Sequence, residues 1–292
     1  MPGIGPALRT FALAACSLVL LSGCAGASTS ETAVSAADRQ GPTVIGTNRS
    51  TESRLVAALY GELLTAAGQE VRMAPTAYAS AADTAKAVLA GKIGLAPAYE
   101  TTMLRALPGG DTMPGNMAAT LSMALPPGIV ALKPAAAERG VVLAVTRATA
   151  RRHLLRGLTD LRRTGGRLTL GGPASGDPDA PSVSSLRKKY GVALAPAGTS
   201  RMADVLVLRS TAPSISKDGL VVLTDPKDVV PPEHVFPLVS APYAGSTARK
   251  ALAGVNARLT TDQLAALVAS VDAGRAPGEV AKAWLRAEGL LS

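Results

Sequence analysis

Residues that could carry out catalysis are sparse in this chain. Ser-x-x-Lys, a spacing that can bring a lysine amine to a serine hydroxyl, occurs at Ser185/Lys188 and again at Ser214/Lys217. The Ser-Asp-Asn and Lys-Thr-Gly elements that accompany this pair in penicillin-recognising enzymes do not occur. The two histidines have no partner at a useful spacing, and no HExxH, GxSxG, GxGxxG or phosphate-loop pattern is present. We therefore expect no enzyme activity, no metal site and no cofactor.

The N-terminal segment indicates an exported protein. An apolar run from Thr10 to Leu21 follows the single basic residue Arg9; it is too short to cross a bilayer and is typical of a signal peptide. The run closes with Leu-Ser-Gly-Cys, which resembles the bacterial lipoprotein box, where the cysteine is lipidated (palmitate) and becomes the first mature residue. We expect a signal peptide over 1–23 and a lipidated Cys24. The alternative is an ordinary secretory signal in which this cysteine has no special role.

The mature chain would be a folded domain on a tether. Residues 24–41 are rich in Ala, Ser and Thr and predict a flexible linker after the lipidated cysteine. Cys16 lies inside the apolar run, so no intrachain disulfide can form after processing. The rest of the chain, about 250 residues, is long enough to bury roughly three quarters of its unfolded surface. We expect the protein at the cell membrane, lipid-anchored on the extracytoplasmic face.

Basic residues are concentrated in one segment. The whole chain has a formal net charge of +9, and residues 141–209 contain twelve Arg and Lys against four Asp. This suggests a separate basic lobe that could meet anionic lipid headgroups, an acidic partner or an anionic ligand. The alternative, a solvated basic face without a partner, is the more common explanation of such a pattern. Nucleic acid is not an expected partner outside the cytoplasm.

Short apolar runs alternate with helical patterns, which indicates an α/β fold with parallel, doubly wound sheets. Thr43–Gly46 is typical of a buried strand that enters a turn, and Ser50 can cap a helix that closes at Gly68. We expect further strands at 69–73, 93–97, 141–145, 168–170, 205–208 and 221–223, and helices at 81–90 and 148–163. Two more helices are expected after Thr260 and Gly278.

Several stretches, taken in order, resemble the substrate-binding lipoproteins of osmoprotectant ABC importers. That family captures glycine betaine, choline, carnitine and related quaternary amines. The matching stretches are Val44-Ile45-Gly46 with Thr51-Glu52, residues 91–99, Gly157 to Leu161, Lys189-Tyr190-Gly191, Asp204 to Thr211, 220–223 with Pro231, Pro232 and Pro237, and the closing helices from Leu259 to Leu290. The resemblance covers about 42–292.

The resemblance implies a type II periplasmic-binding-protein fold, with two α/β lobes that close by a hinge motion on a ligand cleft between them. Mapped onto this chain, lobe 1 comprises 42–140 and 212–292, and lobe 2 comprises the basic segment 141–211. The implied partners are a small-molecule solute and an ABC permease in the membrane.

The resemblance also implies a set of ligand-binding residues. The family holds a trimethylammonium group in a box of tyrosines by cation–π contacts. Tyr99 matches one box tyrosine, and Thr102 matches the polar residue three positions later. Two other tyrosine positions correspond to Val141 and Arg209. The remaining changes are Asn48 and Ser53 for the family's lysine and glutamine, Ala212 for an acid, and a shortened stretch over 196–200.

Two functions follow for such a site. The first is a solute-binding lipoprotein with changed specificity, in which Tyr99, Thr102, Ser53, Asn48 and Arg209 face the cleft. Arg209, with Asn48 and Arg49 beside a helix N-terminus, would suit a carboxylate or another anion. The second is a non-transporting interaction lipoprotein that keeps the fold with a degenerate pocket. A cell-envelope enzyme is a third alternative, but the chain offers it no nucleophile, base or metal ligands.

Overall fold

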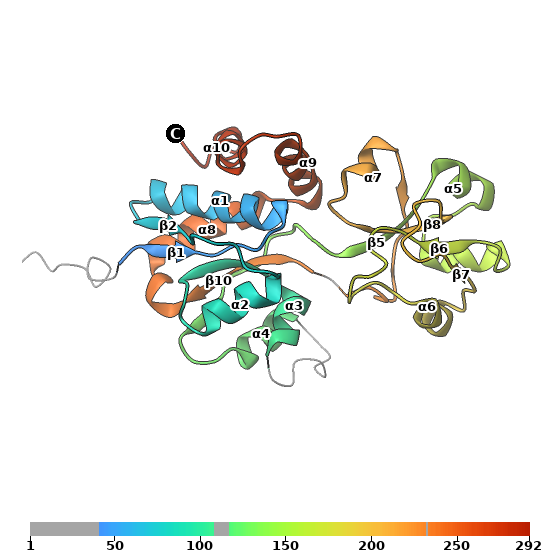
Figure 1. Cartoon of the computed structure of the whole chain (residues 1–292), viewed down its shortest axis with the longest axis horizontal. Helices are drawn as coiled ribbons and strands as arrows, with labels where there is room; N and C mark the ends of the chain where they lie inside the picture. Colours follow the sequence, from blue (N-terminus) through green and yellow to red (C-terminus); the bar gives the residue numbers. More distant parts are fainter. Residues whose placement is uncertain (1–40, 108–116, 232) are drawn as a thin grey trace, which may run out of the picture. The chain divides into compact units, whose positions relative to one another are not determined.

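The computed structural model describes residues 41–107, 117–231 and 233–292 (Figure 1). The signal peptide expected at 1–23 and the lipidation expected at Cys24 lie outside the described residues. Within the described ranges, no helix combines the length and the apolar character needed to span a membrane.

The first sheet has the strand order β2-β1-β3-β10-β4. Its strands are β1 (Thr43–Ile45), β2 (Val71–Met73), β3 (Leu95–Tyr99), β4 (Ile129–Ala131) and β10 (Val235–Ser240). β2, β1 and β3 run parallel, whereas β10 runs antiparallel to both of its neighbours, β3 and β4. We call this sheet and its helices the first lobe; it is therefore built from both ends of the described chain.

Helices cover both faces of the first sheet (Figure 1). One face packs on α1 (Thr51–Ala66), α8 (Ser246–Arg258), α9 (Thr261–Asp272) and α10 (Pro277–Ala287), and the other on α2 (Ala81–Leu89), α3 (Glu100–Ala106) and α4 (Met117–Ala124). The alternation of the strand residues divides the core: Leu95 and Tyr99 of β3 join the α1 side, whereas Ala96 and Ala98 join the α2 side.

The helix caps that the sequence predicted are present. Ser50 accepts the backbone N–H of Ser53 at the start of α1, and Thr260 forms a capping box with Gln263 at the start of α9. α1 places Leu55, Leu59 and Leu63 in the core at helical spacing. The first turn of α1 is consequently fixed beside the end of β3, where the predicted site lies.

The second sheet has the strand order β7-β6-β8-β5-β9. Its strands are β5 (Val141–Val145), β6 (Thr169–Gly171), β7 (Ala195–Pro196), β8 (Val205–Arg209) and β9 (Val221–Val222). Around it lie α5 (Arg147–His153), the 3-10 helix η3 (Leu158–Thr164), α6 (Val183–Tyr190) and α7 (Pro213–Lys217). This second lobe has its own core, to which strands and helices both contribute apolar residues.

Three expectations differ from the structure. Both sheets are mixed rather than parallel. In the first, β10 comes back from the second lobe and runs antiparallel to β3, so that Val235 pairs with Tyr99. In the second, β5 runs antiparallel to both β8 and β9. The second boundary lies after Val230, not at 211, because β9 pairs with β5 and Val229 and Val230 pack on the second core.

The single basic helix expected over 148–163 is broken. α5 ends at His153, its C-cap Leu154 adopts a left-handed φ of 52°, and η3 begins only at Leu158. Between them the chain turns inward to bury Leu155, and Gly157 forms a bridge with Thr224. A Cβ at Gly157 would lie 2.5 Å from the Thr224 hydroxyl oxygen, so this close approach requires glycine.

His234 connects the two segments that join the lobes. These segments run from β4 to β5 and from β9 to β10. The His234 Nδ1 lies 2.8 Å from Glu100 Oε2, and its Nε2 lies 3.1 Å from Glu138 Oε1. The backbone N–H of Arg139 donates to the carbonyl of Glu233 at 2.9 Å. Hydrogen bonds to the two carboxylates raise the pKa of His234 to about 10, so the ring is charged at neutral pH.

We predict that His234 makes stability dependent on alkaline pH. Its pKa is raised on folding, so its contribution is complete below the ordinary histidine value of about 6.5 and is lost as the pH rises through about 10. Urea unfolding at pH 7 and pH 9.5 should show wild type and His234→Gln converging in stability at the higher pH. His153→Gln is the matched control. An equal gap between wild type and His234→Gln at both pH values would contradict the assignment.

We predict that Gly172→Ala destabilises the second lobe by about 2–4 kcal/mol. Gly172 has a φ of 143°, and a Cβ there would lie 2.5 Å from the carbonyl oxygen of Val207. Gly176→Ala is the control, because nothing lies within 4 Å of its added Cβ. Denaturant unfolding of both variants measures the difference; equal stabilities would show that the backbone at Gly172 relaxes freely.

Candidate functional site

Four strand ends meet where the two sheets adjoin the connecting segments. β3 ends at Tyr99 and pairs there with the start of β10, and β8 ends at Arg209 and pairs there with Val141 at the start of β5. Val141 and Arg209, which stand at two of the family's tyrosine positions, are therefore cross-strand partners. Antiparallel pairing thus places side chains from distant parts of the chain at these four strand ends.

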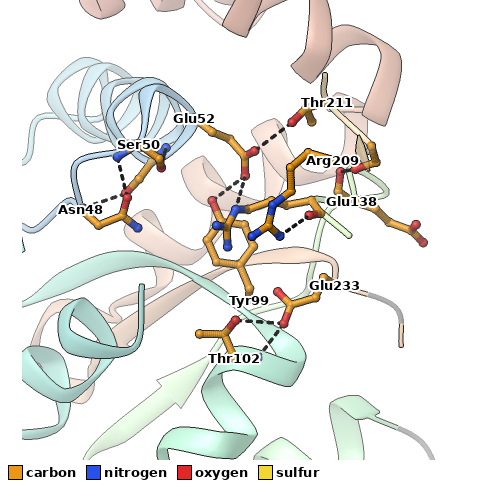
Figure 2. Close-up of polar contacts among 12 residues, drawn as sticks. Asn48, Ser50, Glu52, Tyr99, Thr102, Glu138, Arg209, Thr211 and Glu233 are labelled. Atoms are coloured by element: carbon orange, nitrogen blue, oxygen red, sulfur yellow. Dashed lines mark hydrogen bonds and ion pairs between the residues drawn. The ribbon is translucent and has the colours of Figure 1, made fainter. Parts of the chain in front are cut away.

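The Tyr99 side chain is buried, and its hydroxyl is bound to a buried carboxylate. Its hydroxyl donates to Glu52 Oε1 at 2.6 Å, and Glu52 Oε2 accepts from the Thr211 hydroxyl at 3.3 Å (Figure 2). Tyr99 is 1% exposed and Glu52 is 5% exposed. Burial raises the pKa of Glu52, although Arg139 and these hydrogen bonds oppose the rise.

Arg139 covers the aromatic face. Its guanidinium carbon lies 4.7 Å from the centroid of the Tyr99 ring, within cation–π range. Its Nε lies 3.9 Å from Glu52 Oε1, at the outer limit of an ion pair. The protein thus places a cation of its own on the tyrosine that the sequence matched to the family's cation box.

A pocket of about 260 Å³ lies beside this pair. The first lobe contributes Thr102 and Arg105 to its wall, the second lobe contributes Asp177, Asp179 and Arg209, and the connecting segment contributes Arg139. Arg209 pairs with Asp177, and Arg105 pairs with Asp179. The pocket wall is therefore charged, with two of its three arginines neutralised by aspartates.

Glu233 is a second buried carboxylate at the site. Its Oε1 accepts from the backbone N–H of Thr102 at 2.6 Å and from the Thr102 hydroxyl at 3.0 Å (Figure 2). Burial raises its pKa to about 7, against the opposing effect of these hydrogen bonds. Burial, and to a smaller extent repulsion from Arg139, lowers the pKa of Arg209. Charges of both signs thus act on one another across the site.

Asn48 and Ser53 build the loop that precedes α1. The Ser53 hydroxyl accepts the backbone N–H of Asn48 at 3.0 Å, and Asn48 Oδ1 accepts the backbone N–H of Ser50 at 2.8 Å. Ser53 is 0% exposed and Asn48 is 4% exposed. Of the five side chains expected to bind ligand, Thr102 and Arg209 line the pocket and Tyr99 lies behind Arg139.

Sequence reasoning missed Glu52, Arg139 and Glu233. Glu52 was matched to the family in the stretch Thr51-Glu52 but was given no role in the site, and the other two belong to no motif. The spacing Asp-Pro-Asp at 177–179, inside an otherwise basic segment, is the one signal that could have drawn attention to the pocket. Among the described residues, no group of three His, Cys, Asp or Glu could hold a metal ion.

Comparison with known structures identifies the fold. The structure of a glycine betaine/carnitine/choline ABC transporter superposes with a TM-score of 0.73 at 17% identity, covering 86% of this chain and 100% of that one. Apo YehZ from Escherichia coli gives 0.65 at 20% identity, with coverages of 86% and 100%. Lactococcal OpuAC, closed on glycine betaine, gives 0.54 at 15% identity, with coverages of 86% and 97%. The predicted two-lobed periplasmic-binding-protein fold is confirmed.

Sequence comparison identifies the family. No curated protein sequence matches the chain significantly. The family model OpuAC, the substrate-binding domain of ABC-type glycine betaine transport systems, matches residues 41–287. Proteins of this family bind small solutes for delivery to an ABC permease and are not enzymes. Because the match spans most of the chain, this protein belongs to the family of substrate-binding domains of ABC-type glycine betaine transport systems.

Proposed function

We propose that this protein is the extracytoplasmic solute-binding lipoprotein of an ABC importer and that its solute carries an anionic group bound at Arg139 and Arg209. The family supports the transport role. The observation that carries the anionic group is the Arg139 guanidinium, 4.7 Å from the centroid of Tyr99 in the wall of the pocket.

Arg139 has the longest ion pair of the three arginines in the pocket wall. Arg105 and Arg209 each pair with an aspartate, whereas the carboxylate nearest to Arg139 in an ion pair, Glu52, is 3.9 Å away. A bound carboxylate would give Arg139 a closer anionic partner through charge-assisted hydrogen bonds.

A quaternary amine without an anionic group fits this wall poorly. It would have to displace Arg139 from Tyr99 and would then lie among like charges. Glycine betaine and carnitine carry a carboxylate and keep one favourable contact, but choline has none. We therefore propose a specificity changed from the trimethylammonium group toward the anionic group.

The second candidate is an interaction lipoprotein with a degenerate pocket. The burial of Tyr99, which is 1% exposed, favours this function, because its ring is already covered by protein groups and offers a solute no free aromatic surface. Saturable binding of a small solute distinguishes the two functions.

We predict that carboxylate-bearing solutes raise the Tm of the full chain in detergent, whereas choline does not. The panel comprises acetate, glycine betaine, carnitine, ergothioneine and choline. Arg139→Gln should weaken carboxylate binding about 10- to 100-fold, the loss expected for one charge-assisted hydrogen bond. Arg152→Gln, on the exposed surface of α5, is the matched control. A shift by choline alone would contradict the anionic site, and no shift by any solute would favour the interaction lipoprotein.

We predict that Cys24→Ser moves the protein from the membrane fraction to the soluble extracytoplasmic fraction. Two acyl chains give lasting attachment, and without the cysteine they have no site of addition. Fractionation of cells followed by immunoblotting measures the distribution, with Cys16→Ser as the control in the signal segment. Membrane association of Cys24→Ser equal to that of wild type would contradict lipidation at this residue.

A further inference from the structure

Glu233 has one carboxylate oxygen with no hydrogen-bond partner among the described residues. The residue is 2% exposed. Thr102 donates twice to Oε1, which fixes the orientation of the carboxylate, but Oε2 is buried without a donor. Figure 2 shows this second oxygen turned away from Thr102, to the side on which Tyr99 and Arg209 lie.

A buried acceptor without a donor lowers the stability of the fold, so such groups are rare in proteins and often have a functional role. The adjoining groups tie Glu233 to the candidate site: Thr102 is part of the pocket wall, and the Glu233 carbonyl accepts from the backbone N–H of Arg139. Asp179 and Arg139 are both close enough to act on the carboxylate electrostatically. The free oxygen thus belongs to the same electrostatic environment as the proposed anion-binding arginines.

We propose that Glu233 Oε2 accepts an N–H group of the solute, so that the solute is a zwitterion bearing a primary, secondary or tertiary ammonium rather than a quaternary one. This inference rests on the proposed function, which supplies the arginines for the anionic end. An ammonium with at least one N–H satisfies the free oxygen, whereas a trimethylammonium group has no hydrogen to donate. Methylation of the solute's nitrogen therefore becomes the discriminating feature.

The test uses two methylation series that keep the carboxylate constant. The first is glycine, sarcosine, N,N-dimethylglycine and glycine betaine; the second is 4-aminobutyrate and its N-trimethyl derivative. Isothermal titration of the full chain in detergent should give affinities that drop by about tenfold or more when the last N–H is lost. Wild-type affinity for glycine betaine equal to or above that for dimethylglycine would overturn the inference.

Glu233→Gln tests the loss of the solute contact separately from a loss of stability. The amide oxygen can still accept from Thr102, but an N–H₂ group replaces the free acceptor. We expect the variant to lose about tenfold or more in affinity for the N–H-bearing solutes and to bind glycine betaine as wild type does. Glu279→Gln, exposed on α10, is the matched control, and the Tm of each variant reports folding. Equal weakening of all the solutes by Glu233→Gln would overturn the inference.

Proton release gives a second readout. Because the pKa of Glu233 is raised to about 7, binding of an ammonium at pH 7 favours the ionised carboxylate and releases protons. Titration in buffers of different ionisation enthalpy measures this release, which should disappear in Glu233→Gln. Release that is unchanged in the variant would exclude Glu233 as the acceptor.

The outcomes distinguish this inference from the function on which it rests. If binding depends on Arg139 but not on methylation, the anionic site stands and the inference is wrong. If sulfate binds but no member of either methylation series binds, the anionic site also stands and the inference is also wrong. If no solute binds, the proposed function fails and the inference fails with it.

Discussion

The site depends on one contact: the Arg139 guanidinium on the face of Tyr99, with the Glu52 carboxylate beside both. The three groups come from a connecting segment, the end of β3 and the first turn of α1. Each restricts the others, because the tyrosine hydroxyl is fixed by the carboxylate and its ring is covered by the arginine. A cation supplied by the protein occupies the surface on which a solute's cation would otherwise lie, so any cation of the solute has to be bound by other groups of the pocket.

Those remaining groups come in opposite charges that only partly compensate one another. The aspartates at 177 and 179 neutralise two arginines, and burial favours the protonated forms of Glu52 and Glu233. A wall of this kind is poorly suited to an apolar or purely cationic molecule, since every exposed group on it requires a counter-charge or a hydrogen bond. It is suited to a small molecule that carries both signs of charge.

Local patterns predicted much of the fold, and long-range pairing decided the rest. The cap at Ser50, the helix start at Thr260 and the apolar strand Val141–Val145 were predicted because each depends on residues close together in sequence. β10 was missed: Pro237 argues against a strand, yet it lies opposite Pro97 of β3, and its carbonyl accepts the backbone N–H of Leu132. The site divides in the same way. Tyr99, Thr102 and Arg209 were found through motifs, whereas Glu52, Arg139 and Glu233 become partners only when segments far apart in sequence meet.

The insertion of β10 between β3 and β4 also bears on the order in which the chain folds. The second lobe is contiguous in sequence, from β5 to β9, and its contacts can form as soon as that segment is available. The first sheet cannot be completed until β10 arrives, which begins at Val235, whereas the strands it separates end at Tyr99 and Ala131; α8 to α10 arrive later still. Closing so long a loop is slow, so the last step of folding is the assembly of the first lobe around its C-terminal elements. During synthesis from the N-terminus, the first lobe therefore stays unfinished, with its apolar strands uncovered, until the C-terminal elements have been made.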